Sequence, residues 1–289
     1  ITERHYENIN PIPTTRDTAI HDILLVGDSH LDQTPSNRRF QNHLNTSVSA
    51  HSHWSYEGPT SPFTLGVALA QIQEPKLVVF EVVERNLVYF AQQHLGQDSI
   101  ENPSIRTTRL TGKTRTFSHL GNGIRTAAGL LNVRHKWLKN DQCKILASRN
   151  NTPLHSQKQI LITNQVWHRR KPSEEVTSTL ASLQQVLAQQ LEPVGTDFII
   201  YVIPDKATVY SDFFESPDLP PSFLLGDTLP SKVCSPIHSM LEAVNQGVME
   251  VYKYSDTHLG VSGAQIVGNH LQSVIDQQII TAPNALQQP

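Results

Sequence analysis

Cysteine and methionine are the scarcest residue types in this chain, because its 289 residues contain two of each. The two cysteines, Cys143 and Cys234, are too few and too far apart for a zinc site made of paired cysteines. In an oxidising compartment they could form one disulfide, whereas otherwise they would remain two buried thiols. The sequence leaves both outcomes open.

Charge and long apolar runs are also sparse. Charged residues make up 17% of the chain and apolar residues 38%, and Gln, Asn, Ser and Thr fill the difference. The net charge of −3 gives no global attraction to nucleic acid or to anionic membranes. No run approaches the roughly 18 apolar residues of a membrane-spanning helix, so none is predicted. The chain begins at Ile1 rather than at methionine, and we expect a signal peptide or a membrane anchor upstream of it.

Apolar patterns predict strands and helices that alternate along the chain. Short apolar runs predict buried strands at residues 23–26, 76–83, 145–146, 160–162, 197–203 and 248–252. Helices are expected at residues 36–44, 63–72, 172–191, 237–244 and 263–279, with Ser173 as the cap of the third. Alternation of this kind is typical of an α/β fold whose central sheet is mainly parallel and has helices on both faces.

One domain accounts for most of the length. We place it at residues 21–280, between an extended lead-in at residues 1–20 and a C-terminal tail at residues 281–289. A basic insertion covers about residues 100–144 of this domain.

Residues 106–144 of the insertion hold nine of the 23 basic residues of the chain against a single acid, Asp141. This patch favours an anionic partner such as a uronic-acid polymer or phosphate, although solvated charge on an irregular insertion is the commoner explanation. Aromatic residues are too sparse there for nucleic acid, which is not expected as a partner. The nine residues are Arg106, Arg109, Lys113, Arg115, Arg125, Arg134, Lys136, Lys139 and Lys144.

The strand at residues 23–26 ends in a small polar turn, Gly27-Asp28-Ser29. Open α/β sheets bind their ligands just past the carboxyl ends of the strands, so Ser29 would stand where a site is expected. All three residue types also favour ordinary turns, which is the alternative explanation. His30 is interpreted as part of the site wall, because neighbouring side chains at a strand end point apart.

Two further stretches are predicted to lie near the same edge. The strand at residues 76–83 is followed by Glu84 and other polar residues, which would meet Ser29 in a parallel sheet or else form a strand-end salt bridge. Residues 47–62 are interpreted as a polar, aromatic loop that returns to the first strand. The candidate residues for substrate binding or for an oxyanion hole are Tyr56, Gly58, Arg85 and Asn86.

More than 200 residues after Ser29, Asp256-Thr257-His258 offers the partners that a serine nucleophile needs. A serine hydroxyl is a weak nucleophile at neutral pH and requires an adjacent base, and histidine titrates in the right range. A carboxylate then orients the imidazole and stabilises its charged form. Residues two apart in an extended segment point the same way, so Asp256 and His258 can converge on one site. The prediction is a catalytic triad of Ser29, His258 and Asp256, with no metal and no cofactor.

Together these blocks resemble the SGNH (GDSL-type) hydrolase superfamily, in which an N-terminal Gly-Asp-Ser block holds the serine and a C-terminal block holds Asp and His. The resemblance covers residues 23–272 and implies a three-layer α/β/α sandwich with a mainly parallel central sheet. Stretches that look closer to the alginate O-acetyltransferase-like (AlgJ/AlgX-type) branch lie at residues 79–85, 202–210 and 256–258.

The chain departs from that branch in several places. Leu259 stands where the branch has tryptophan, and Ser255 stands where an acid is usual. The serine block comes first, which resembles a circular permutation of the branch. No Gly-x-Asn-Asp block is visible, so the resemblance assigns no second oxyanion donor. The Gly-Asp-Ser-His version is also similar to SGNH domains attached to membrane acyltransferases that acetylate surface polysaccharides.

The resemblance implies a serine-dependent O-acetyltransferase that acetylates hydroxyls of a cell-surface or exported polysaccharide through an acetyl-serine intermediate. It also implies a periplasmic or other extracytoplasmic location, with a membrane acyltransferase as a source of the acetyl donor. An acetylesterase with the same triad and a non-catalytic polysaccharide-binding module are the alternatives.

Overall fold

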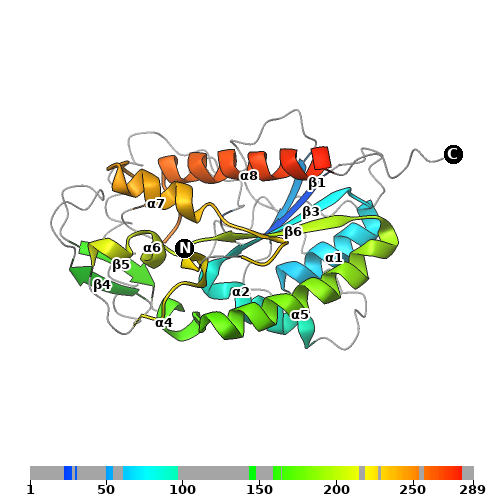
Figure 1. Cartoon of the computed structure of the whole chain (residues 1–289), viewed down its shortest axis with the longest axis horizontal. Helices are drawn as coiled ribbons and strands as arrows, with labels where there is room; N and C mark the ends of the chain where they lie inside the picture. The colour runs from blue at the N-terminus through cyan, green and yellow to red at the C-terminus, as the bar shows by residue number, and fades with distance from the viewer. Residues whose placement is uncertain are drawn as a thin grey trace, which may run out of the picture.

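A five-stranded parallel sheet forms the centre of the protein (Figure 1). The computed structural model describes residues 23–27, 30, 50–54, 61–96, 143–147, 159–163, 165–214, 219–226, 229–253 and 257–281. The strands of the sheet are β1 (Ile23–Gly27), β2 (Ala50–Trp54), β3 (Leu77–Val83), β6 (Asp197–Ile203) and β7 (Val233–Cys234). They lie in the order β2-β1-β3-β6-β7, and every neighbouring pair is parallel.

Apart from Glu81 in β3, the inner strands are apolar on both faces from their second residue on, as is typical of a parallel sheet between helices. All residues of β1 and β3 are buried, and only Asp197, at the start of β6, is exposed in that strand. Their aliphatic runs form strands because both faces contact helices rather than water. The strands predicted at residues 23–26, 76–83 and 197–203 are confirmed.

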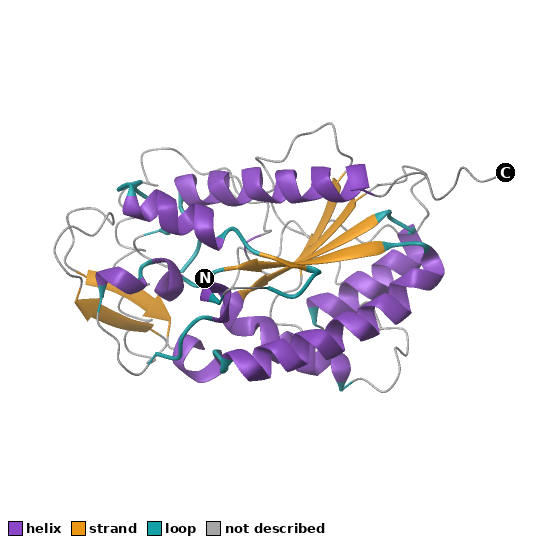
Figure 2. Ribbon diagram, viewed as in Figure 1, coloured by secondary structure: helices purple, strands orange, loops and turns teal. Residues whose placement is uncertain are grey.

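Helices cover the sheet from both sides (Figure 2). One side holds α1 (Pro62–Gln73), α2 (Leu87–Leu95) and α5 (Ser173–Leu191), and the other holds α7 (Ile237–Asn245) and α8 (Val261–Thr281). The described chain is therefore a mixed α/β fold with a parallel central sheet. In the part of the chain that the structure describes, no helix combines the length and the apolar character needed to cross a membrane.

The helix α5 shows how the sequence pattern determines packing. Its first turn carries Glu174 and Glu175, whose charges complement the helix dipole. Ser173 is the first helical residue, and Pro172 occupies the cap position without a side-chain hydrogen bond, so the predicted serine cap is wrong. The residues that form one buried stripe along α5 are Val176, Leu180, Leu183, Leu187 and Leu191.

A second, smaller sheet lies at one end of the molecule in Figure 1. Its two strands, β4 (Cys143–Ala147) and β5 (Gln159–Thr163), are antiparallel and confirm the short strands predicted there. The short helices are α4 (Gln165–Arg169) and α6 (Lys206–Val209). Single 3-10 turns are η3 (Glu84–Asn86), η4 (Glu192–Val194), η5 (Ser211–Phe213) and η6 (Phe223–Leu225).

Cys234 lies in β7 and is a free, half-buried thiol. Burial raises the pKa of this thiol above its ordinary value, and the nearby Lys232 opposes the shift. Of the two outcomes left open for the cysteines, the structure shows the free thiol at Cys234, and its thiolate form is disfavoured at neutral pH.

Two segments differ from the sequence-based expectation for identifiable reasons. The sequence predicts a strand at residues 248–252, but the structure has only a single bridge there, between Tyr252 and Leu259. Gly247 and Glu250 have φ angles of 79° and 60°, so the chain turns twice and does not stay extended. The interpretation of residues 47–62 as a loop is wrong for β2, whose Ala-His-Ser-His-Trp run lacks the apolar pattern of a strand.

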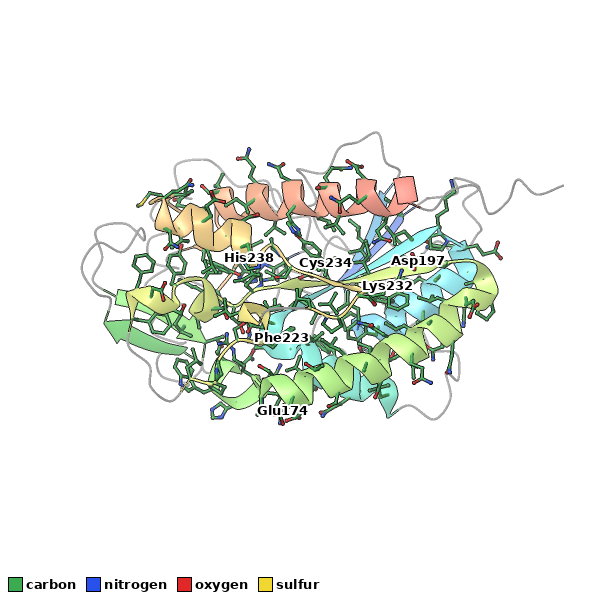
Figure 3. All side chains as sticks on the ribbon, in the orientation of Figure 1. Glu174, Asp197, Phe223, Lys232, Cys234 and His238 are labelled. Carbon is green, nitrogen blue, oxygen red and sulfur yellow. The ribbon has the colours of Figure 1, made fainter. Side chains whose placement is uncertain are left out.

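The carboxyl ends of β1, β3 and β6 lie at one edge of the sheet, because the strands are parallel. The opposite edge is marked by the ion pair of Asp197 and Lys232, 2.7 Å apart, which Figure 3 shows side by side. The chain continues from β1 to one neighbouring strand, β2, and later to the other, β3. In open α/β sheets such a switch point is where ligands bind.

Several predicted segments lie outside the described residues. They are the lead-in at residues 1–20, the helix at residues 36–44, nearly all of the basic insertion and the tail beyond residue 281. The single domain at residues 21–280 therefore stays a prediction in these parts.

Candidate functional site

Two segments that are far apart in the sequence meet at the carboxyl end of β1. His30 is 4% exposed and follows β1 closely, and the half-buried His258 lies just before α8. The centroids of their imidazole rings are 5.4 Å apart, and the ring planes are tilted by 50°. These are the segments that hold the predicted triad, although Ser29 and Asp256 themselves lie outside the described residues.

The segment that carries His258 is held by contacts between its two ends. We call the described residues of 251–260 the His258 loop. Tyr252 and Leu259 form an antiparallel bridge within it. The Lys253 N–H donates to the His258 carbonyl at 2.9 Å. These contacts hold the backbone of His258, from which its side chain extends.

Two glycines allow α8 to begin against this loop. The Gly260 N–H donates to the Val251 carbonyl at 3.0 Å, and a Cβ atom at Gly260 would overlap the Glu250 carbonyl. A Cβ atom at Gly263 would overlap the Val251 carbonyl in the same way. Only a residue without a side chain permits such a close approach of two backbone segments. This packing explains the Gly-x-x-Gly pattern at the start of α8.

Two buried side chains connect the His258 loop to the end of β6. The Tyr252 hydroxyl donates to the Pro204 carbonyl, and the Lys206 ammonium donates to the Lys253 carbonyl at 2.8 Å. Burial, with a smaller contribution from the Asp205 carboxylate, raises the pKa of Tyr252 well above its ordinary value of 10.0. The phenol therefore stays protonated and keeps its role as a donor.

A buried cluster of two acids and two arginines joins the end of β3 to the end of β6. Arg170 Nη2 lies 3.3 Å from Glu84 Oε2 and 3.3 Å from Asp205 Oδ2. Arg85 forms a second ion pair with Asp205. The Thr208 hydroxyl accepts a hydrogen bond from Arg170 and donates one to Glu84. We call these five residues the ionic cluster.

The carboxyl of Glu84 is strongly affected by its surroundings. Burial raises the pKa of Glu84 above its ordinary value of 4.5, and the negative charge of Asp205 adds to the increase. The Arg170 guanidinium and the Asp205 N–H oppose it. The net increase shows that these partners do not fully offset the cost of removing the carboxylate from water. The ion pair between Arg170 and Glu84 is the strand-end salt bridge that the sequence left open as an alternative.

The structure describes two of the four predicted substrate-binding residues. Arg85 is paired with Asp205 in the ionic cluster. The Asn86 side-chain oxygen accepts a hydrogen bond of 2.8 Å from Arg169. Both lie in η3, directly after β3, at the edge where His30 and His258 meet the end of β1. The two that lie outside the described residues are Tyr56 and Gly58.

Sequence reasoning gave no role to three of the polar residues at this edge. Lys206 follows the apolar strand β6 closely, as Arg85 follows β3. Its place at the carboxyl edge of the sheet could therefore have been predicted from the sequence. Arg170 and Thr208 carry no such signal. Their partners are more than 30 residues away in the chain, and only the packed fold brings them together.

Among the described residues, no group of three or more His, Cys, Asp or Glu side chains is arranged to hold a metal ion. Comparisons with protein-family models, with curated proteins and with solved structures found no match to this chain. The residues at the sheet edge are therefore the basis for assigning a function.

Proposed function

We propose that this protein is a serine-dependent O-acetyltransferase of the SGNH type. Ser29 is its nucleophile, His258 its general base and Asp256 the carboxylate that orients His258. The observation that supports this most is the contact between His30 and His258, whose ring centroids are 5.4 Å apart. Because Ser29 is bonded to His30 and consecutive Cα atoms are about 3.8 Å apart, the serine belongs to the segment that the base touches.

The fold supports the same assignment. β1 ends at Gly27, two residues before Ser29, beside the switch point where open α/β sheets bind ligands. A parallel sheet between layers of helices is also what the resemblance to SGNH hydrolases implies.

The proposed reaction has two halves. In the first, Ser29 Oγ attacks the carbonyl carbon of the acetyl donor while His258 accepts the hydroxyl proton. The tetrahedral intermediate collapses, His258 gives the proton to the leaving group, and an acetyl-serine remains. In the second, an acceptor hydroxyl attacks the acetyl-serine, and His258 transfers the acceptor proton to Ser29 Oγ. Asp256 stabilises the imidazolium in both halves.

The oxyanion of each tetrahedral intermediate needs hydrogen-bond donors. The Ser29 N–H is the first, and each such donor contributes about 3 kcal/mol to transition-state stabilisation. A second donor comes from the segment at residues 56–58, from Arg85 or from Asn86. Asn86 accepts the hydrogen bond from Arg169 through its side-chain oxygen, and its amide NH₂ group is chemically able to donate.

The acceptor in this proposal is a hydroxyl of a cell-surface or exported polysaccharide, and a membrane acyltransferase supplies the acetyl group in an extracytoplasmic compartment. The resemblance to the alginate O-acetyltransferase-like branch supports both statements. The basic insertion supports an acidic polymer as the acceptor, because its positive charge would attract the carboxylates of a polyuronate.

Turnover of a chromogenic acetyl ester, with and without an oligosaccharide acceptor, tests the proposal. Ser29→Ala is expected to lower kcat at least about 1,000-fold, because the triad acts as a unit. Ser182→Ala is the matched control, since Ser182 is exposed on α5 and donates only to the Ser178 carbonyl at 3.2 Å. A Ser29→Ala variant with normal turnover would end the proposal.

The products separate the proposal from its alternatives. Acetylated oligosaccharide, detected by mass spectrometry, indicates a transferase. Acetate alone indicates an acetylesterase with the same triad. A wild-type protein that binds the oligosaccharide without any turnover is a non-catalytic binding module.

A further inference from the structure

We propose that Lys206 is a positioning residue, which holds the His258 loop in place against the end of β1. The inference rests on the proposed function, because it is the base that Lys206 would position. Lys206 is not part of the predicted triad. It follows β6, whereas Ser29 follows β1.

The burial of Lys206 is the first observation. Its side chain is 2% exposed, although removing an ammonium group from water is costly unless hydrogen bonds replace the lost hydration. The ammonium donates to the Lys253 carbonyl at 2.8 Å, and a charged donor makes a stronger hydrogen bond than a neutral one. The Lys206 ammonium therefore binds the backbone of the His258 loop.

The connection from this contact to the base is short. Lys253 accepts from Lys206 through its carbonyl, and its N–H donates to the His258 carbonyl at 2.9 Å. A single residue thus links the ammonium to the backbone of His258. Misplacement of a catalytic group by about 1 Å can cost about 100-fold in rate, so even a small shift of this link is expected to affect catalysis.

The other side of the β6 end is fixed by the ionic cluster. Asp205, the residue before Lys206, pairs with both Arg85 and Arg170. Lys206 therefore extends from a backbone that is already held to β3. The end of β6 connects the ionic cluster on one side with the His258 loop on the other.

Lys206→Met removes the ammonium and keeps an apolar side chain that reaches to the Cε position. With the chromogenic acetyl ester, we expect kcat to fall about 10-fold or more and KM to stay within about twofold, because Lys206 positions the base and does not bind substrate. Lys206→Gln, which is neutral and shorter, is the second variant and is expected to show the same fall. Lys232→Met is the matched control, since Lys232 pairs with Asp197 at the opposite edge of the sheet.

The imidazole signals of His258 in an NMR spectrum give a second readout that does not need turnover. They are expected to shift in Lys206→Met and to stay unchanged in Lys232→Met. Wild-type kcat and unshifted signals in both folded Lys206 variants would overturn the inference. Shifted signals together with a fully active Ser29→Ala variant would leave Lys206 as an anchor of the loop and reject the proposed function alone.

Discussion

At the residue scale, Arg170 compensates the negative charge of two buried carboxylates at this edge of the sheet. One guanidinium lies 3.3 Å from two buried carboxylates, Glu84 and Asp205. A buried carboxylate without a partner is costly, so the ionic cluster is tolerated only while each charge is paired. The positions of η3 and of the β6 end therefore depend on a residue from neither strand.

Replacing Arg170 by methionine is expected to lower the free energy of unfolding by about 3–5 kcal/mol, because two buried carboxylates lose a partner. Urea denaturation measures this change. Lys171→Met is the control, since the Lys171 side chain is 40% exposed and its ammonium lies 3.5 Å from Glu175; a change below about 0.5 kcal/mol is expected there. If Arg170→Met and Lys171→Met lowered the free energy of unfolding equally, the argument that the buried ion pairs of Arg170 matter more than an exposed pair would be contradicted.

The sequence predicted part of this cluster. Glu84 and Arg85 follow an apolar strand directly, so their place at the carboxyl edge could be inferred from the pattern alone. Their partners could not be inferred, because Arg170 lies 86 residues from Glu84 along the chain. Contacts of that separation depend on how α4 and α5 pack against the sheet, which no local pattern encodes.

At the scale of elements, the start of α8 determines the position of the His258 loop. Gly260 and Gly263 let the first turn of the helix lie against the carbonyls of Glu250 and Val251. The helix in turn packs on the sheet through buried residues such as Val267. His258 is therefore positioned by the packing of a whole helix as well as by the loop that carries it.

Gly260→Ala is expected to lower the free energy of unfolding by about 1–3 kcal/mol, because the new methyl group overlaps a backbone carbonyl that has no rotamer to change. It is also expected to lower ester turnover, since the His258 loop must move. Gln265→Ala, at an exposed position of α8, should stay within about 0.5 kcal/mol of the wild type. Denaturation and turnover of both variants measure the effects, and a Gly260→Ala protein as stable and active as the wild type would contradict the packing argument.

Elements with a strong apolar pattern could be predicted, and elements without one could not. The stripe of α5 and the runs of β3 and β6 predicted their bounds to within a few residues. β7 has only two residues, and it forms because β6 offers it hydrogen bonds rather than because of its own composition. α2 was missed because it follows the polar turn η3 without a break.

At the scale of the whole molecule, the order of the strands brings the site together. The residues at the carboxyl edge come from five distant parts of the chain, after β1, β3, α4 and β6 and before α8. Alternating strands and helices predicted the parallel sheet and the helices on both faces. The order β2-β1-β3-β6-β7 was not predicted, because it depends on which crossover packs on which face.

The central claim is that Ser29 is a nucleophile activated by His258, and a serine-reactive sulfonyl fluoride tests it most directly. Peptide mass spectrometry is expected to locate one adduct on Ser29. The labelling rate should fall at least about 100-fold in His258→Gln, because general-base assistance is lost. It should be unchanged in His238→Gln, an exposed histidine of α7. An adduct on a different residue, or a wild-type rate in His258→Gln, would contradict the account.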